Sequence, residues 1–453
     1  MKKIILSLIT IHLSIFTLYA QSWSSVDPGI SIFSVNTITV CNNELCAACA
    51  DGHGAYYISG FNNSSWNSYN ANLTAIGNVA INMLYSYNNN LMVGGLFTYA
   101  GTPATKVNNI AILNDTTWTP LSRGLTGPGF SNQVGTFTTY NNNLVVGGIF
   151  DSAGNIHSPS IAMWNGSAWD SLGGGFSGYP NIINALCVYN GNLYAAGSFL
   201  IAGGTLANNI AMWNGTTWDS LGSGINGSNV YVTSLCVYNG NLYAGGAFTK
   251  AGGAPANNIA MWNGTSWSAV GTGVDTMGAV YALTVYNGSL CVAGQFTNAG
   301  GNPANNIALW NGTAWSAMGS GTNNIVWGLT VYNGALFAGG EFDTAGGLAT
   351  NHIARWGTTP AGINDIQNNT QDINVYPNPT NGVLTVVIKN YELGITNQVE
   401  VYNMLGEKVH SQFTINNSQF TIDLSNNPSG VYLYKVTAQD GNIIGQGKVV
   451  IQK

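Results

Sequence analysis

Charge is what this chain lacks most. Of its 453 residues only 6% are charged, with 11 Lys and Arg against 17 Asp and Glu. The basic residues form no cluster, which argues against a nucleic-acid partner, since phosphate contacts need one. Beyond the first twenty residues there is no long apolar run either, so the sequence predicts no transmembrane segment in the mature protein. Chemistry that needs several charged groups therefore has few residues to use.

The first twenty residues have the features of a targeting segment. Lys2 and Lys3 precede a largely apolar run that begins at Ile4, and the small residue Ala20 stands before Gln21. A positive start, an apolar stretch and a small residue at the cleavage point are typical of a secretory signal peptide. The sequence therefore predicts a signal peptide over residues 1–20 and an exported mature chain.

Cysteine is scarce, with six residues in the whole chain. Two pairs occupy equivalent positions in different copies of a repeat, Cys187 with Cys236 and Cys46 with Cys291. Packed sheets lie about 10 Å apart, whereas a disulfide needs Cα atoms within about 7 Å, so we expect these four to be buried free thiols. Cys41, Cys46 and Cys49 are close enough in sequence that one local bridge can form. Their spacing matches a zinc site poorly, and we expect no metal or other cofactor.

Glycine and asparagine are abundant, and they recur in a repeated stretch whose clearest copy is Asn209–Ile225. It predicts two short strands, Ile210–Trp213 and Thr216–Leu221, joined by a two-residue turn at Asn214-Gly215. Asn-Gly between apolar runs predicts a type I′ hairpin turn, because this turn needs a positive φ at both residues. Further copies lie at Ile161–Leu172, Ile259–Val270 and Ile307–Met318, with less regular ones at Ile110–Leu121 and Ile353–Trp356.

A second marker, a strand–turn–strand such as Leu235–Gly246, alternates with the first. Its central leucine occurs seven times at intervals of 46 to 53 residues, at Leu45, Leu91, Leu144, Leu193, Leu242, Leu290 and Leu336. Each repeat then has four strands, two from each hairpin. Four strands at this period are typical of a β-propeller blade. The sequence therefore predicts an all-β fold with a seven-bladed β-propeller over residues 21–358.

The two ends of the repeat array predict how the propeller closes. The seventh repeat stops after its third strand, near Trp356. Residues Trp23–Ile30 match the fourth-strand pattern of Trp218–Ile225 but stand alone before the first repeat. We therefore expect this N-terminal strand to complete the last blade, which would remove an open sheet edge.

The double glycine of Leu242–Gly246 and the tryptophan at Trp267 resemble the kelch family of repeats. The match is poor in the first repeat. The Ala-Gly-Gly loops at Ala251–Gly253 and Ala299–Gly301 also depart from the family pattern. The resemblance implies a propeller architecture and says little about activity, since propellers host many functions.

The composition changes after a polar linker at residues 359–372. Short strands alternate with turns over residues 373–453, which predicts a small C-terminal antiparallel β-sandwich. The motifs at Tyr376–Gly382, Asn403–Gly406, Ser429–Leu433 and Lys448–Val450 closely resemble the C-terminal sorting domain of the type IX secretion system, type A. That resemblance implies a Gram-negative cell, the type IX secretion machinery as a partner, and a product secreted or attached to the outer cell surface.

Candidate ligand-binding residues come from equivalent positions just before the inner strand of each blade. They are Asn36, Asn82, Gly135, Asn184, Thr233, Tyr281 and Trp327. We expect them to surround one mouth of the central channel, where amides beside aromatic rings suit a sugar or a peptide. The alternative is that Tyr281 and Trp327 only pack between blades.

Candidate catalytic groups are fewer. Asp151 and Asp343 follow a strand in loops and would be the reactive carboxylates of a polysaccharide-acting enzyme. His53, His157 and His352 come from different blades, which argues against a shared metal. No base, nucleophile and orienting partner are visible together. The sequence therefore favours a surface recognition or adhesion protein that binds a glycan, peptide or protein, with an extracellular enzyme or a structural scaffold as alternatives.

Overall fold

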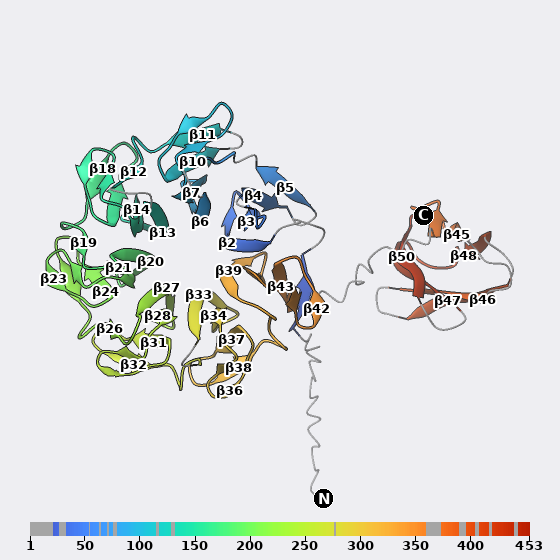
Figure 1. Ribbon diagram of the computed structural model, residues 1–453. Helices are drawn as coiled ribbons and strands as arrows, with labels where there is room; N and C mark the ends of the chain where they lie inside the picture. Colours follow the sequence, from blue (N-terminus) through green and yellow to red (C-terminus); the bar gives the residue numbers. More distant parts are fainter. Residues whose placement is uncertain are drawn as a thin grey trace, which may run out of the picture. The chain divides into compact units, whose positions relative to one another are not determined.

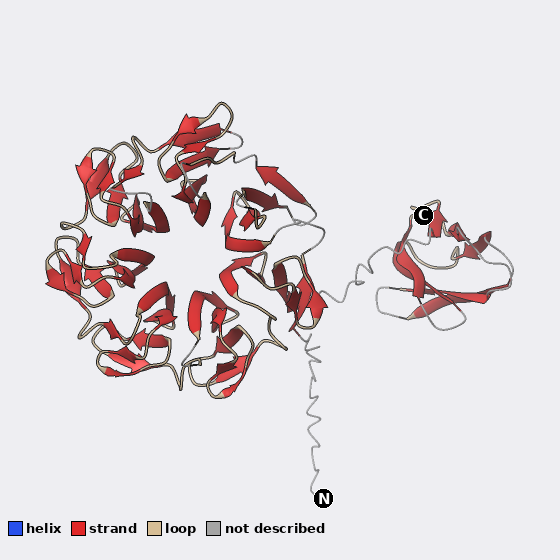
Figure 2. Cartoon of the chain, in the orientation of Figure 1, coloured by secondary structure: helices blue, strands red, loops and turns tan. Residues whose placement is uncertain are grey.

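The computed structural model contains strands and no helix in the residues that it describes, so the all-β prediction is confirmed (Figure 2). It describes residues 21–453 except 27–32, 54, 63–64, 70–71, 76–78, 115–116, 128–131, 276–277, 359–372, 389–395, 404–406, 416–418 and 439–442. The predicted signal peptide at 1–20 and the linker at 359–372 lie outside the described residues. The chain divides into two compact units, Met1–Thr358 and Thr359–Lys453.

The first unit is built from antiparallel sheets of four strands, numbered here as sheets 1 to 7 in chain order of their first two strands. Sheets 1 to 3 contain β2(Ser34–Cys41), β3(Glu44–Ala50), β4(Tyr56–Phe61), β5(Trp66–Tyr69); β6(Ala80–Tyr87), β7(Asn90–Leu96), β10(Ile110–Asn114), β11(Thr117–Pro120); and β13(Gln133–Tyr140), β14(Asn143–Ile149), β17(Ile161–Trp164), β18(Trp169–Ser171). Sheets 4 and 5 contain β20(Ile182–Tyr189), β21(Asn192–Ser198), β24(Ile210–Trp213), β25(Trp218–Ser220); and β27(Tyr231–Tyr238), β28(Asn241–Ala247), β31(Ile259–Trp262), β32(Trp267–Ala269). Sheets 6 and 7 contain β33(Ala279–Tyr286), β34(Ser289–Gln295), β37(Ile307–Trp310), β38(Trp315–Ala317); and β39(Val326–Tyr332), β40(Ala335–Gly340), β43(Ile353–Thr358), β1(Gln21–Ser25).

These sheets follow one another around a ring (Figure 1). The first strand of each sheet is innermost, and each inner strand contacts the inner strand of the next sheet, including β39 of sheet 7 with β2 of sheet 1. Sheet 7 takes its outer strand from the N-terminal end of the described chain, because β1 pairs with β43 in a register that sets Trp23 opposite Trp356. This is the pairing that the sequence predicts.

The predicted type I′ turn occurs in this fold, but at a different hairpin. The first two strands of each sheet are joined by two residues with positive φ, for example Asn190 (φ 47°) and Gly191 (φ 77°). The prediction of such a turn at Asn214-Gly215 is wrong. Trp213 pairs with Trp218, so the loop has four residues, and Asn214 Oδ1 accepts the backbone N–H groups of the third and fourth of them. The asparagine acts here through its side chain.

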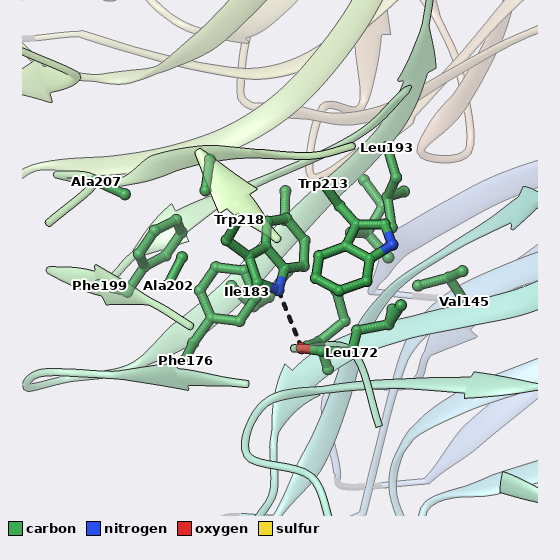
Figure 3. Packing of buried hydrophobic residues seen from close by; sticks show 14 of the residues in the cluster. Val145, Leu172, Phe176, Ile183, Leu193, Phe199, Ala202, Ala207, Trp213 and Trp218 are labelled. Atoms are coloured by element: carbon green, nitrogen blue, oxygen red, sulfur yellow. Dashed lines mark hydrogen bonds between the residues drawn. The ribbon is translucent and has the colours of Figure 1, made fainter. Parts of the chain in front are cut away.

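Tryptophans at the start of the outer strands connect neighbouring sheets. The indole Nε1 of Trp218 donates a 3.0 Å hydrogen bond to the carbonyl of Leu172, at the end of the preceding sheet (Figure 3). The ring of Trp218 also packs edge-on against Phe176, with centroids 4.7 Å apart. The cluster around it contains Tyr140 and Ile161 from sheet 3 and so lies between two sheets. Burial between sheets explains why one repeat cannot fold alone.

Short hairpins form the loops between the second and third strands. They comprise β8(Tyr99–Ala100), β9(Thr105–Lys106), β15(Ser152–Ala153), β16(Ile156–His157), β22(Ile201–Ala202), β23(Thr205–Leu206), β29(Lys250–Ala251), β30(Ala254–Pro255), β35(Asn298–Ala299), β36(Asn302–Pro303), β41(Thr344–Ala345) and β42(Leu348–Ala349). In three of these loops another short strand joins: β12(Leu125–Thr126), β19(Phe176–Ser177) or β26(Ile225–Asn226). Asn209 fixes one of these loops, because its Oδ1 accepts from Phe199 N and its Nδ2 donates to Ile225 O.

The second unit has two antiparallel sheets. One contains β44(Ile373–Tyr376), β45(Val383–Ile388) and β48(Gln419–Asp423), and the other contains β46(Thr396–Tyr402), β47(Lys408–Ile415), β49(Gly430–Ala438) and β50(Ile443–Ile451). One core joins them, with Leu384 and Ile422 from the first sheet against Val399 and Val436 from the second. Two sheets with a shared core are the arrangement of a small sandwich.

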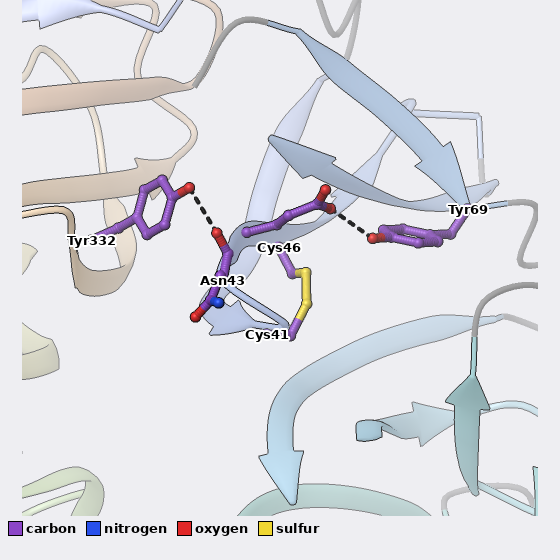
Figure 4. Close-up of a disulfide and its surroundings, with 6 residues drawn as sticks. Cys41, Asn43, Cys46, Tyr69 and Tyr332 are labelled. Atoms are coloured by element: carbon purple, nitrogen blue, oxygen red, sulfur yellow. Dashed lines mark hydrogen bonds between the residues drawn. A yellow bond between two sulfur atoms is a disulfide. The ribbon is translucent and has the colours of Figure 1, made fainter. Parts of the chain in front are cut away.

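Cys41 and Cys46 form a disulfide across the β2–β3 hairpin (Figure 4). The predicted local bridge therefore exists, and the prediction that Cys46 is a free thiol is wrong. Its position matches that of Cys291 in another sheet, but Cys41, which replaces the tyrosine that ends the other inner strands, gives it a partner within reach. Cys187, Cys236 and Cys291 are free, as predicted, although the first two are only partly buried.

Candidate functional site

The seven predicted binding positions share one backbone feature. In every inner strand the register shifts by one residue at the predicted position, so each of these residues is the extra residue of a β-bulge. The shifts lie between Val35 and Thr37, Ile81 and Met83, Val134 and Thr136, Ile183 and Ala185, Val232 and Ser234, Val280 and Ala282, and Val326 and Gly328. A bulge turns one side chain out of the alternating pattern of its strand. The inner strands therefore carry a ring of re-aimed side chains, called here the bulge ring.

Three members of the bulge ring connect neighbouring sheets. Asn82 Nδ2 donates to Val134 O at 2.9 Å, and Asn184 Nδ2 donates to Val232 O at 3.3 Å. Thr233 Oγ1 donates to Val280 O in the same way. Each acceptor is the carbonyl just before the bulged residue of the next sheet. These three residues, predicted to bind a ligand, thus connect neighbouring inner strands.

Tyr281 and Trp327 pack against each other, with ring centroids 4.4 Å apart and an angle of 39° between the rings. The two side chains are partly buried, and they connect sheet 6 with sheet 7. Burial raises the pKa of Tyr281 to about 12, with further contributions from a hydrogen bond to Tyr231 and the charges of Tyr231 and Glu341. Packing between sheets is therefore one role of this pair.

A pocket of about 520 Å³ lies where sheets 7, 1 and 2 meet. It is lined by Phe33, Ser34, Asn36, Ala50, Gly52, Tyr56, Asn82, Trp327 and Glu341. This volume falls in the range of small-molecule sites, about 300 to 1,000 Å³. Its wall combines aromatic rings, two amides, two hydroxyls and one carboxylate. We call it the closure pocket, because it lies at the junction where the last sheet meets the first.

The closure pocket brings together three of the predicted residues and leaves the others elsewhere. Asn36, Asn82 and Trp327 line it, whereas Asn184, Thr233 and Tyr281 do not. The sequence predicts seven equivalent positions, and the bulges agree with this. The closure pocket, however, is lined by three of them and not by all seven.

The predicted positions leave out six residues of the pocket wall: Phe33, Ser34, Ala50, Gly52, Tyr56 and Glu341. Phe33 and Tyr56 belong to the first repeat, which matches the others least well. Glu341 is one of the 17 acidic residues of the chain, and no motif singles it out. The available signal was its position: the equivalent residues in the other six sheets are not acidic, as the strand registers below establish.

The predicted carboxylates Asp151 and Asp343 are not brought together. They follow the second strands of sheets 3 and 7, which are not neighbours in the ring. Asp343 Oδ1 accepts from Asn323 Nδ2 at 2.6 Å and from Thr344 Oγ1 at 2.9 Å, and these hydrogen bonds lower the pKa of the Asp343 carboxyl. Asp151 Oδ1 lies 3.3 Å from His157 Nδ1, and both side chains are exposed. Both carboxylates stabilise their own loops.

The three histidines named from the sequence also lie apart, in the loops between the second and third strands of sheets 1, 3 and 7. His53 donates its backbone N–H to Asp51 Oδ1 at 2.8 Å, and His352 adopts a positive φ of 61° in a turn. No group of three His, Cys, Asp or Glu side chains suited to a metal ion occurs in the described part of the chain. The described residues likewise contain no helix with the length and apolar character needed to cross a bilayer.

The C-terminal unit identifies the export route. Residues 374–452 match the family described as the secretion system C-terminal sorting domain. This family marks proteins that leave the cell through the type IX secretion system, so the protein is secreted and is attached to or released from the cell surface. Through this domain the chain interacts with the type IX machinery. No curated protein matches the chain.

Several solved structures align with the chain at low sequence identity. The extracellular domain of a hybrid two-component system from B. thetaiotaomicron aligns with a TM-score of 0.47 and 10% identity, covering 95% of this chain and 57% of that one. The extracellular domain of a one-component system from the same organism gives 0.34 and 13%, covering 92% and 69%. Sqt1 from Saccharomyces cerevisiae gives 0.40 and 9%, covering 95% and 98%. The chain thus spans 57% of the length of the first.

Proposed function

We propose that the protein is a secreted recognition protein, a seven-bladed β-propeller that binds a glycan in the closure pocket. The observation that carries the proposal is the wall of that pocket, where Asn36, Asn82 and Trp327 come together at the junction of sheets 7, 1 and 2. Amides and a flat aromatic ring on one wall suit a sugar, whose hydroxyls form hydrogen bonds and whose C–H faces stack on a ring.

The assignment to propellers, and to the kelch-like kind, rests on the four-stranded repeats, the circular contacts of the inner strands and the double glycines. In this proposal residues 21–358 form the propeller, residues 359–372 a linker, and residues 373–453 a sorting domain of type A. Secretion then presents the propeller to ligands outside the cell.

The side-chain amides of Asn36 and Asn82 each keep hydrogen-bonding groups that a ligand can use. Asn36 accepts from Ser34 Oγ at 3.0 Å through its Oδ1, so its amide N–H groups remain available in the described structure. Asn82 donates through Nδ2 to Gln133 Oε1 and Val134 O, both at 2.9 Å, which leaves its Oδ1 as an acceptor. One donor and one acceptor beside an aromatic ring match the alternating donors and acceptors of sugar hydroxyls.

A glycan and peptide array probed with the mature protein tests this function. We expect binding to a defined group of glycans, lost in the double variant Asn36→Ala, Trp327→Ala. The matched control is Asn184→Ala, which changes an equivalent bulge residue that does not line the pocket. Wild-type binding retained by the double variant would overturn the assignment of the site, and binding to peptides alone would overturn the ligand class.

The two alternative functions, an extracellular enzyme and a structural scaffold, would give different experimental results. Release of sugar products from polymers, abolished by Asp151→Asn or Asp343→Asn, would indicate the extracellular enzyme. Self-assembly of the mature protein with no array ligand would indicate a surface scaffold. Neither is favoured by a specific contact in the structure.

A further inference from the structure

We infer that the glycan bound in the closure pocket carries a free, protonated amine, as an amino sugar does. This inference rests on the proposed function and narrows its ligand class. It comes from the one charged side chain among the described residues of the pocket wall, the carboxylate of Glu341.

The fold does not require a carboxylate at this position. Glu341 N donates to Ile325 O at 3.0 Å. This hydrogen bond places Glu341 opposite Ile325, two residues before the bulged Trp327. In the other six sheets the equivalent registers hold Ala50, Leu96, Ile149, Ser198, Ala247 and Gln295. None of these is acidic. The repeat therefore forms without a negative charge here, and the charge needs another explanation.

One carboxylate oxygen of Glu341 is held by a hydrogen bond, and the other is available to a ligand. Its Oε1 accepts from the indole Nε1 of Trp327 at 3.2 Å. Its second oxygen makes no hydrogen bond or ion pair with the described residues. A charge-assisted hydrogen bond from an ammonium group would satisfy this oxygen, and such bonds are stronger than those between neutral groups. The bond from Trp327 fixes the carboxylate so that little orientational freedom is lost when a ligand binds.

Aromatic rings in the pocket wall can contact a cation beside Glu341. Phe33, Tyr56 and Trp327 all line the pocket with Glu341. Ring faces attract ammonium groups, and the attraction grows as water is excluded. Phe33 is 63% exposed, which is high for a large apolar side chain, and a ligand in the pocket can cover it. The backbone under this ring is fixed, because Phe33 N donates to Ala50 O at 2.8 Å.

The net charge of the first unit also favours a cationic ligand. Between Trp23 and Trp356 the sequence has four basic and ten acidic residues, a formal charge of −6. None of the four basic residues lines the pocket. A cationic ligand is thus attracted to this unit, whereas an acidic glycan is repelled.

The size and the amides favour an amino sugar over a lysine side chain. A pocket of about 520 Å³ exceeds the space that one alkyl ammonium chain fills. Asn36 and Asn82 supply a donor and an acceptor that a hydroxyl-rich ring uses and an alkyl chain does not. Binding of lysine peptides in place of amino sugars is therefore an outcome of the test that would overturn this inference.

Calorimetric titration of the mature protein tests it, at about pH 6, where an amine of pKa near 8 is protonated. The probes are the tetramer of glucosamine, its fully N-acetylated form, and a tetralysine peptide. We expect the free amine tetramer to bind at least about tenfold more tightly than the acetylated one, since a charge-assisted hydrogen bond is lost on acetylation. Glu341→Gln should remove this preference, because it keeps an acceptor for Trp327 and deletes the charge.

Asp170→Asn is the matched control, since it removes one exposed carboxylate from sheet 3 and should leave the preference unchanged. Equal binding of the two tetramers, or a preference that survives Glu341→Gln, would overturn the amine inference while leaving the proposed glycan site intact. Failure of every glycan tested to bind, on the array as in the titration, would instead count against the proposed function itself.

Discussion

The indole Nε1 of Trp23 donates a 2.8 Å hydrogen bond to the carbonyl of Met318, which is 295 residues later in the chain. Trp218 makes the same contact with Leu172 at 3.0 Å, within the continuous part of the ring. Trp23 is also packed against Trp356, with centroids 5.2 Å apart. The N-terminal strand therefore reproduces the contacts of an ordinary fourth strand.

This equivalence predicts that Trp23→Phe destabilises the ring more than Trp118→Phe. Both tryptophans are buried, with 4% and 6% exposure, so the two changes remove similar apolar volume. Trp118 Nε1 has no hydrogen-bond partner in the described structure, whereas Trp23 Nε1 is paired. We expect an additional loss of about 1 to 2 kcal/mol in the free energy of unfolding for Trp23→Phe. Urea unfolding measures it, and equal losses would mean that β1 contributes no specific contact.

The bulge ring predicts a steric effect at Gly135. A Cβ at this position would lie 2.6 Å from the carbonyl oxygen of Ile183 in the next sheet. Gly135→Ala should therefore lower the free energy of unfolding by about 1 to 3 kcal/mol. Gly357→Ala is the control, because the nearest atom to its Cβ would be the Cβ of Ala335 at 3.4 Å, an ordinary van der Waals distance. If the two variants unfold at the same denaturant concentration, the close approach of the inner strands is not present in solution.

Tyr281, which packs against Trp327, predicts a loss of stability at alkaline pH. Its pKa is raised from 10.0 to about 12, chiefly by burial. The folded state thus holds the phenolic proton more tightly than the unfolded chain, so this contribution to stability is complete below pH 10 and disappears as the pH rises towards 12. Thermal unfolding across this range should show a smaller loss for Tyr281→Phe than for the wild type. Identical pH profiles would contradict the assignment of a partly buried, protonated hydroxyl to Tyr281.

The cysteines predict a defined labelling pattern. Burial raises the pKa of Cys187 to about 11 and that of Cys49 to about 12, and it also raises the pKa of Cys291. Because the thiolate is the reactive form, iodoacetamide at neutral pH should label the native protein slowly. After unfolding without reductant, mass spectrometry should find labels on the four free cysteines and none on Cys41 or Cys46. Six labels would contradict the disulfide.

The repeat and its closure could be predicted from the sequence because they depend on local patterns. Trp23 stands in the same context as Trp218, and the inner-strand leucines recur at nearly constant spacing. The type of turn at Asn214 could not be predicted from its two residues alone. There the pairing of Trp213 with Trp218 sets the loop length, and the asparagine side chain supplies the hydrogen bonds that a shorter turn would not need.

The candidate site was predictable only in part. Alignment of the repeats places Asn36, Asn82 and Trp327 at equivalent positions. Each of the three is the bulged residue of its inner strand. Alignment treats all junctions alike, however, so it could not show that the pocket forms between sheets 7, 1 and 2. Phe33 and Glu341 line that pocket because of contacts between the two ends of the ring, which no local pattern records.

The most direct test of the account is a crystal structure of the mature protein with its best-binding glycan. We predict density in the closure pocket, with a sugar ring on Trp327, hydroxyls on Asn36 and Asn82, and an amine on Glu341. A glycan bound elsewhere on the molecule, with this pocket unoccupied, would contradict the central claim.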